Sequence, residues 1–197
     1  TGDGVNDAPA VKEADIGVAM GITGTDVTRQ AADMVLLDDN FATLVSAVEQ
    51  GRGIYANIRK FVRYLLSCNI GEVLTMFLGI IFGMPMVLMP SQILLVNLVT
   101  DGLPAVALGV EPCGEENMRK PPRHKDESFF SGGLMFRIVF RGMLIGICTL
   151  ACFTVMLRTG AGLGAARTGA LLTLVMSQLF HVFECKSETK NIFTRSE

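Results

Sequence analysis

The first ten residues, TGDGVNDAPA, place two carboxylates, one carboxamide and two glycines in a tight turn. Asp3 and Asp7 carry the carboxylates, Asn6 carries the amide, and Pro9 suits the first turn of a following helix. Carboxylate oxygens are preferred Mg²⁺ ligands, and Asn6 and the glycine amides around Gly4 can contact phosphoryl oxygens. An Asp- and Asn-rich loop that binds nothing has the same composition, so these residues alone leave both interpretations open.

A second group of polar side chains interrupts two long apolar stretches, 61–83 and 90–109. Within each stretch they are three or four residues apart, which predicts that they project from one face of a helix. An acid at the centre of a membrane helix costs about 2.5 to 3.5 kcal/mol on insertion scales, so it marks a functional site by default. These residues are Asn69 and Glu72 in the first stretch, and Asn97, Thr100 and Asp101 in the second.

The second stretch also contains helix breakers directly after its acid. Gly102 follows Asp101, and Pro104 lacks the amide that would bond the Thr100 carbonyl. Unwound backbone with free carbonyls at membrane depth is typical of cation sites. Together the carboxylate, amide, hydroxyl and carbonyl oxygens favour Ca²⁺ as the bound ion. Hydrogen bonding between helices would explain single residues such as Asn69, but it does not explain two acids.

The elements that carry these residues are mostly apolar helices. Half of the 197 residues are hydrophobic and 18% are charged, which favours a membrane protein. A helix needs about 20 residues to cross a hydrocarbon core of about 30 Å. Basic residues cluster before the first span, between the second and third, and after the fourth, which places those segments in the cytosol. No basic face typical of nucleic-acid binding is present. The four predicted spans are 61–83, 90–109, 133–157 and 167–185.

The first 56 residues alternate between helix and strand signals. We expect helices near 8–14 and 25–32, strands at 15–20 and 34–37, and a helix that starts near Phe41 and continues into the membrane. The run from Asp38 to Asn40 is predicted to cap that last helix. Because so few residues cannot cover both faces of a sheet, further strands are expected upstream of this chain.

The string TGDGVNDAPAVK resembles the hinge motif of P-type cation-transporting ATPases. The later string AADMVLLDDNFATLVSAVEQGRGIYANIRKF is similar to the end of their phosphorylation domain and the stalk into the fifth membrane helix. The resemblance implies that 1–56 is the C-terminal part of an α/β, haloacid-dehalogenase-like phosphorylation domain. It also implies that Asp3 binds Mg²⁺ with support from Asp7, and that Asn6 contacts the phosphoryl group beside Gly4.

The segments NIGEV at 69–73 and NLVTDGLPA at 97–105 resemble the fifth and sixth membrane helices of calcium pumps. The resemblance implies that 57–197 is an all-α transmembrane cation-transport domain with four helices, the fifth to the eighth of the pump. Sodium pumps resemble this region more weakly. The implied ligands of the transported cation are Asn69, Glu72, Asn97, Thr100 and Asp101.

The fourth span departs from the calcium-pump pattern. Two-site calcium pumps carry a Glu in the eighth helix, and alignment on Cys185 puts Phe183 there, with Glu184 adjacent and Gln178 a turn and a half earlier. One helical step rotates a side chain by about 100°, so Glu184 need not face the site. One transported ion per cycle follows if Phe183 holds this position. His181, on the same span, is expected to be a hydrogen-bonded packing residue rather than a proton carrier.

The predicted function is ATP-driven transport of Ca²⁺ through an aspartyl-phosphate, in an integral multi-pass protein of a bacterial plasma membrane or an organelle. Alternatives are a pump for Na⁺ or Mn²⁺, a membrane-anchored dehalogenase-like phosphatase, or a passive channel. The expected partners are the bilayer, the cation and the remainder of the pump, including its actuator and nucleotide-binding domains. This fragment alone is expected to be inactive, because it lacks the phosphorylated Asp motif and most of the ATP site.

Overall fold

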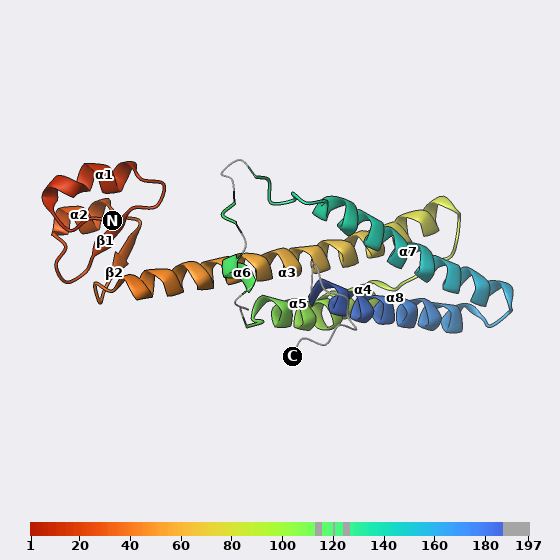
Figure 1. The fold of residues 1–197 in the computed structure, drawn as a ribbon. Helices are drawn as coiled ribbons and strands as arrows, with labels where there is room; N and C mark the ends of the chain where they lie inside the picture. The colour runs from red at the N-terminus through yellow and green to blue at the C-terminus, as the bar shows by residue number, and fades with distance from the viewer. Residues whose placement is uncertain (113–115, 120, 124–126, 187–197) are drawn as a thin grey trace. The chain divides into compact units, whose positions relative to one another are not determined.

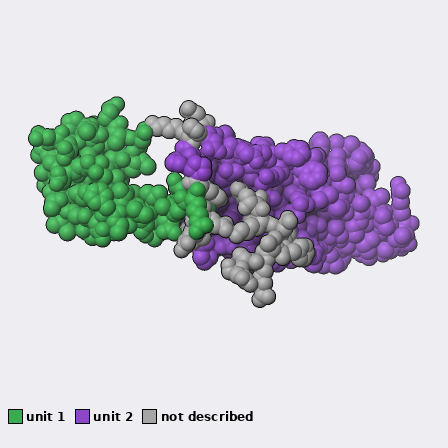
Figure 2. All heavy atoms as spheres, viewed as in Figure 1, with its two compact units in different colours: residues 1–53, 113–120 green, residues 54–112, 121–197 purple. Residues whose placement is uncertain are grey.

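The computed structural model describes residues 1–112, 116–119, 121–123 and 127–186. It divides the chain into two compact units, coloured separately in Figure 2. Unit 1 contains residues 1–53 and 113–120, and unit 2 contains residues 54–112 and 121–197. The described residues are mostly helical, as Figure 1 shows.

Unit 1 begins with alternating helices and strands, as its sequence predicts. The two strands pair in parallel, with Val18 opposite Met34 and Met20 opposite Leu36. Gly2 makes an isolated parallel bridge to Ala19, which places the N-terminal turn beside β1. The elements are the 3₁₀ helix η1 (Val5–Asp7), α1 (Ala8–Glu13), β1 (Val18–Met20), α2 (Asp26–Ala31) and β2 (Met34–Leu36).

A small apolar core holds unit 1 together. Gly17 approaches α1 so closely that a Cβ there would lie 2.1 Å from the Val11 carbonyl oxygen, so only glycine fits. The connection between α1 and β1 can therefore pass tightly under the helix. The buried side chains of this core are Ala8, Val11, Val18, Ala19, Thr28 and Leu36.

Helix α3 (Phe41–Ile81) is 41 residues long and contains both the predicted stalk and the first predicted span. The Asn40 side-chain oxygen accepts the Ala42 amide at 2.9 Å, and Asp38 accepts the Thr43 hydroxyl at 2.6 Å. These bonds satisfy donors in the first turn and fix where the helix begins. The helix runs through Gly51 without interruption, which confirms that it continues from the stalk into the apolar stretch.

Four helical stretches are long and apolar enough to cross a membrane, which confirms the predicted spans. The second stretch is built from three consecutive helices that differ in winding. The fourth begins at Leu163, four residues before its predicted start. Besides α3, the elements are α4 (Pro90–Leu95), the π-helix η2 (Val96–Asp101), α5 (Gly102–Gly109), α7 (Leu134–Arg158) and α8 (Leu163–Lys186); α6 (Glu116–Arg119) belongs to unit 1.

Small residues let α3 and α7 approach closely in unit 2. A Cβ on Gly142 would lie 2.5 Å from Ile70 Cγ2, and one on Gly146 would lie 3.0 Å from the Gly71 carbonyl oxygen. Membrane helices associate mainly through such close backbone packing, since lipid provides no hydrophobic drive between them. Two buried clusters fill the rest of the unit. One contains Val87, Leu88, Val96, Ile145, Leu150, Phe153, Ala166, Ala170 and Leu174, and the other Tyr64, Cys68, Ala105, Leu108 and Cys185.

Candidate functional site

The N-terminal turn is organised around the Asp7 carboxylate. Its Oδ2 accepts the backbone amides of Gly4 at 3.0 Å and Asp3 at 3.2 Å. The Gly4 bond, followed by the Asp3 bond, holds the pKa of Asp7 below its ordinary value, because both stabilise the ionised form. Asp7 is therefore occupied with holding the turn, while Asp3 and Asn6 are exposed.

Two threonines on the α2 side support the same turn and were missed in the sequence. The Thr28 hydroxyl donates to the Gly4 carbonyl at 2.7 Å, and the Thr25 amide donates to the Asp3 carbonyl at 2.8 Å. Thr28 is fully buried. Thr25 and Thr28 thus hold the backbone carbonyls of Asp3 and Gly4 in place.

Asp39 does not cap α3, contrary to the prediction for 38–40. Its carboxylate instead accepts the amides of Gly21 at 2.6 Å, Ile22 at 3.0 Å and Thr23 at 2.8 Å. These bonds, that of Ile22 first, lower the pKa of Asp39 to about 2. Asp39 has a φ of 51°, a left-handed conformation that Asp tolerates better than most residues. Asp38 and Asn40 make the predicted cap of α3 without Asp39.

Within unit 2, the two acids in the predicted spans come together in the interior. Glu72 on α3 is 4% exposed, and Asp101 at the end of η2 is 1% exposed. Gln178 on α8 donates its amide to Glu72 Oε1 at 3.0 Å and to Asp101 Oδ2 at 3.5 Å. One amide therefore bridges two carboxylates from two other helices.

Two further donors complete this buried cluster. Asn97 donates to Glu72 Oε2 at 3.0 Å, and the Tyr64 hydroxyl lies 3.3 Å from Asp101 Oδ1. Gln178 is fully buried, and its Oε1 has no hydrogen-bond partner in the described part of the chain. We call Glu72, Asp101, Gln178, Asn97 and Tyr64 the acid-pair cluster.

The backbone beside Asp101 is wound differently from the expectation. The segment before Pro104 is a π-helix, not unwound chain, and the Thr100 carbonyl accepts the Tyr64 hydroxyl at 3.1 Å. The expectation of a free carbonyl is therefore wrong. A π-bulge accommodates the missing proline amide within a helix, and such bulges are frequent at functional sites.

Not every predicted ligand reaches the cluster. Asn69 is exposed, and its amide donates to the Leu65 carbonyl at 2.8 Å, so it does not share the buried face of Glu72. Asn97 is also largely exposed but reaches Glu72 with its side chain, whereas Thr100 is half-buried. The prediction that both acids and both amides face inward thus holds for the acids only.

The α8 residue beside the acids is Gln178, and the placement of Phe183 there is wrong. Phe183 is 59% exposed on the outer side of the helix. Glu184 faces away from the acid pair and forms an ion pair with Arg141 of α7. His181 is buried and bonded to Glu184, with Nδ1 to Oε2 at 3.1 Å, which confirms the expected packing histidine.

The oxygen atoms of the acid-pair cluster are chemically suited to a hard cation. Carboxylate, amide, hydroxyl and carbonyl oxygens are the groups that Ca²⁺ prefers. Among the described residues, no group of three or more His, Cys, Asp or Glu side chains is arranged to hold a metal. The candidate site therefore depends on two acids and neutral oxygen donors, not on a cluster of soft ligands.

The chain was compared with known families and proteins. Residues 85–197 match the family model described as "Cation transporting ATPase, C-terminus". The chain is 54% identical over 197 residues to a calcium-transporting ATPase of Bacillus subtilis, covering 100% of this chain and 22% of that protein. It is 48% identical over 188 residues to the endoplasmic reticulum-type calcium-transporting ATPase 4 of Arabidopsis thaliana, covering 95% and 18%.

A fungal relative agrees with these two. The endoplasmic reticulum calcium ATPase srcA of Aspergillus fumigatus is 59% identical over 150 residues, covering 76% of this chain and 15% of that protein. The chain thus spans about a fifth of the length of the relatives it matches. Since the family model matches more than half of this integral membrane chain, the chain belongs to the cation-transporting ATPases and corresponds to their C-terminal region.

Proposed function

We propose that the protein containing this chain is a P-type ATPase that moves Ca²⁺ across a membrane through an aspartyl-phosphate intermediate. The observation that carries the proposal is the buried pair Glu72 and Asp101, bridged by Gln178. Buried acids inside a membrane are costly and mark ion pathways. The names of the similar proteins, calcium-transporting ATPases of bacteria and plants, support calcium as the cargo.

The ion site we propose lies between the two acids. Two ionised carboxylates match the charge of one divalent cation, and Asn97 can add an amide oxygen after rotation of its side chain. Gln178 can do the same, because turning its amide by 180° brings the unpartnered Oε1 toward the acids. Thr100 and Asn69 contribute to this site in our proposal once the remaining helices of the protein pack around it.

The N-terminal turn is proposed to serve the phosphoryl group within a haloacid-dehalogenase-like domain that includes 1–56. The exposed Asp3 carboxylate and Asn6 carboxamide fit a hydrated Mg²⁺ and a phosphoryl oxygen, since Asp7 is already held by backbone amides. When bound, Mg²⁺ would neutralise phosphoryl charge. Asp3 would hold the metal, the Gly4 turn would keep the backbone close, and Asp7 would keep Asp3 in place.

Helix α3 is the proposed mechanical connection between phosphorylation and transport. Its 41 residues extend about 60 Å at 1.5 Å per residue, and Glu72 lies in its second half. A tilt or shift of this helix would move Glu72 relative to Asp101 and open the ion site. Such coupling requires a two-state element, for which the helix is our candidate.

Mn²⁺ and Na⁺ remain alternative cargoes, because the same oxygen atoms suit other ions. A pump for Mn²⁺ or Na⁺ would use the same acids, and only competition between cations separates these cargoes. A membrane-anchored phosphatase would not need two acids inside the membrane, and a channel would not need the Asp3 turn. ATP, the actuator and nucleotide-binding domains, and the choice between a bacterial plasma membrane and an organelle membrane belong to the whole protein in this proposal.

The test uses the full-length protein reconstituted in vesicles. ATP should drive radiolabelled calcium uptake, with Mn²⁺ and Na⁺ tested as competitors. Asp101→Asn should eliminate calcium binding, whereas Asp3→Asn should eliminate the phosphoenzyme and leave calcium binding nearly intact. Calcium binding that survives Asp101→Asn would contradict the ion site, and normal turnover of Asp3→Asn would contradict the role of the turn.

A further inference from the structure

A second polar network lies beside the acid-pair cluster and connects α7 to α8. Glu184 of α8 pairs with the Arg141 guanidinium of α7 through one oxygen and with His181 Nδ1 through the other, the latter at 3.1 Å. The side chains of Arg141 and Glu184 are 34% and 26% exposed. Both lie in helices that are long and apolar enough to cross a membrane, and the ion pair joins these two helices.

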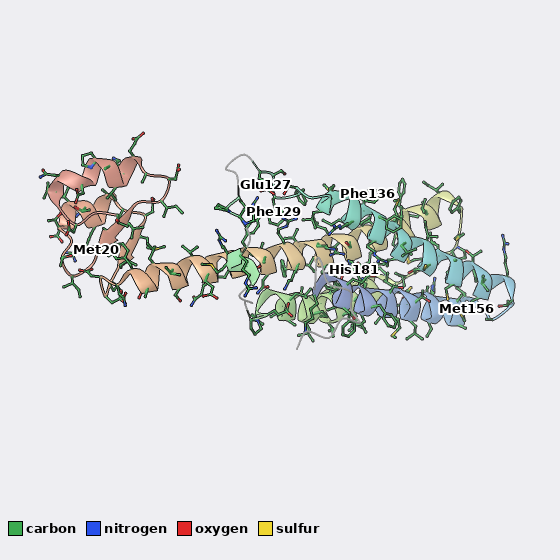
Figure 3. The ribbon with its side chains drawn as sticks, viewed as in Figure 1. Met20, Glu127, Phe129, Phe136, Met156 and His181 are labelled. Carbon is green, nitrogen blue, oxygen red and sulfur yellow. The ribbon has the colours of Figure 1, made fainter. Side chains whose placement is uncertain are left out.

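His181 continues this network toward the acids. Its Nε2 lies 3.4 Å from Cys185 Sγ, and its ring lies against that of Tyr64, with centroids 6.1 Å apart and an interplanar angle of 31°. Tyr64 in turn bonds Asp101. Figure 3 labels His181 on α8. The network therefore extends from Arg141 through Glu184 and His181 to a member of the acid-pair cluster.

The position of Gln178 depends on the rotation of α8 about its axis. The buried face of this helix is spaced by three or four residues, and Glu184 is offset from it toward α7. One residue step turns a helix by about 100°, so even a third of a step would swing the Gln178 amide away from one carboxylate. This face consists of Ala166, Ala170, Leu174, Gln178, His181 and Cys185.

Packing between α7 and α8 is close in the N-terminal half of α8, where a Cβ on Gly169 would lie 2.1 Å from Met156 Sδ, and it is looser at the C-terminal end of α8. A cavity of about 210 Å³ lies there, with Cys148 and Ser177 among its lining residues beside Arg141, His181 and Glu184. Tight interiors resist rotation because side chains interlock, so open space beside the C-terminal end of α8 weakens that resistance locally. The Arg141–Glu184 ion pair is a polar contact that joins α7 to α8 at this end.

We propose that Arg141 and Glu184 are positioning residues that fix the rotation of α8 and thereby hold Gln178 between Glu72 and Asp101. This inference rests on the proposed function, because it assigns the purpose of the pair to the ion site. Loss of either charge removes this contact and lets the C-terminal end of α8 turn toward the cavity. The ion site then loses its bridging amide, although neither Arg141 nor Glu184 touches an acid of the pair.

The test measures equilibrium binding of radiolabelled calcium to the full-length protein carrying Arg141→Gln, Glu184→Gln or both. Each single change should weaken calcium binding on the order of tenfold, and the double change should weaken it no further, because residues in one network are not additive. Arg137→Gln, an exposed arginine one turn earlier on α7, is the matched control and should stay within about twofold.

Phosphorylation by inorganic phosphate without calcium separates positioning from folding. The variants should form as much phosphoenzyme as the parent protein, and Arg141→Lys should restore most of the calcium affinity. Unchanged calcium affinity in Arg141→Gln, additive losses in the double variant, or a proportional loss of phosphoenzyme would each overturn the inference. If Asp101→Asn binds calcium normally, the proposed function itself fails; if only that variant loses binding, the inference alone fails.

Discussion

Gln178 and Glu72 are 106 residues apart in the sequence, yet the Gln178 amide donates to Glu72 Oε1 at 3.0 Å in the interior of unit 2. The contact connects α8 to α3, and the same amide reaches Asp101. A neutral side chain thus keeps two acids together without cancelling their charge.

Replacing Gln178 by Leu should weaken calcium binding about 10- to 100-fold in the full-length protein. The substitution keeps a similar volume but removes the amide oxygen that we propose turns toward the cation, and loss of a buried partner of a charged group costs about 1 to 3 kcal/mol. Equilibrium calcium binding measures the change. Ser177→Ala is the control, because the Ser177 hydroxyl donates to the Thr173 carbonyl of its own helix. Parent-like affinity in Gln178→Leu would remove Gln178 from the site.

Replacing Tyr64 by Phe should destabilise the protein by about 1 to 3 kcal/mol, because Asp101 and the Thr100 carbonyl both lose their buried donor. Tyr55→Phe is a matched control. The Tyr55 hydroxyl is buried with no partner among the described residues, so its removal should cost nothing. The midpoint of thermal inactivation of the full-length protein should fall for Tyr64→Phe alone. Equal midpoints for both variants would show that the Tyr64 hydroxyl contributes nothing.

The sequence was sufficient for the two short strands, the four long apolar helical stretches and the two acids, whereas the short helix α6 was not predicted. Apolar length alone predicts the four spans, and a carboxylate within such a span needs partners wherever it lies. The spacing of residues along one helix predicted less well which side chains are buried. Asn69 and Glu72 are three residues apart, yet only Glu72 is buried, because burial depends on where the neighbouring helices lie.

Partners from distant segments could not be predicted from single-helix patterns. Alignment on Cys185 suggested that Phe183 lies beside the acids. Counting back from Cys185 by four and then three residues instead gives His181 and Gln178, and all three lie on one buried face. That periodicity indicates Gln178 as the α8 residue on the buried face. The expectation of a free Thr100 carbonyl before Pro104 failed for another reason. A π-helix accommodates the missing proline amide, and the Tyr64 hydroxyl donates to that carbonyl.

Asp39→Asn should loosen the loop at 21–23 in a pH-dependent way. The carboxylate accepts three backbone amides there, and its pKa falls from an ordinary 3.8 to about 2 on folding. A depressed folded pKa stabilises the protein above the unfolded value, and this contribution is lost as pH falls from about 4 through about 2. Hydrogen exchange at Gly21, Ile22 and Thr23 should therefore be faster in Asp39→Asn at pH 7.

Parent and variant should converge as the pH approaches 2. The control is Asp26→Asn, because the Asp26 side chain is 84% exposed and pairs with Arg29 on the surface. Exchange that is unchanged in Asp39→Asn at pH 7 would show that the three bonds do not hold the loop.

Gly142→Ala should destabilise the packing of α3 against α7, whereas Gly51→Ala should stabilise the protein. A Cβ on Gly142 would lie 2.5 Å from Ile70 Cγ2 and 2.9 Å from the Ser67 carbonyl oxygen, so the two helices must separate. Such overpacking costs about 1 to 3 kcal/mol. At Gly51 nothing lies within 4 Å, and alanine in a helix interior is favoured over glycine by about 0.5 to 1 kcal/mol. The midpoint of thermal inactivation should shift in opposite directions, and a shared direction would show that the close approach of α3 and α7 does not limit stability.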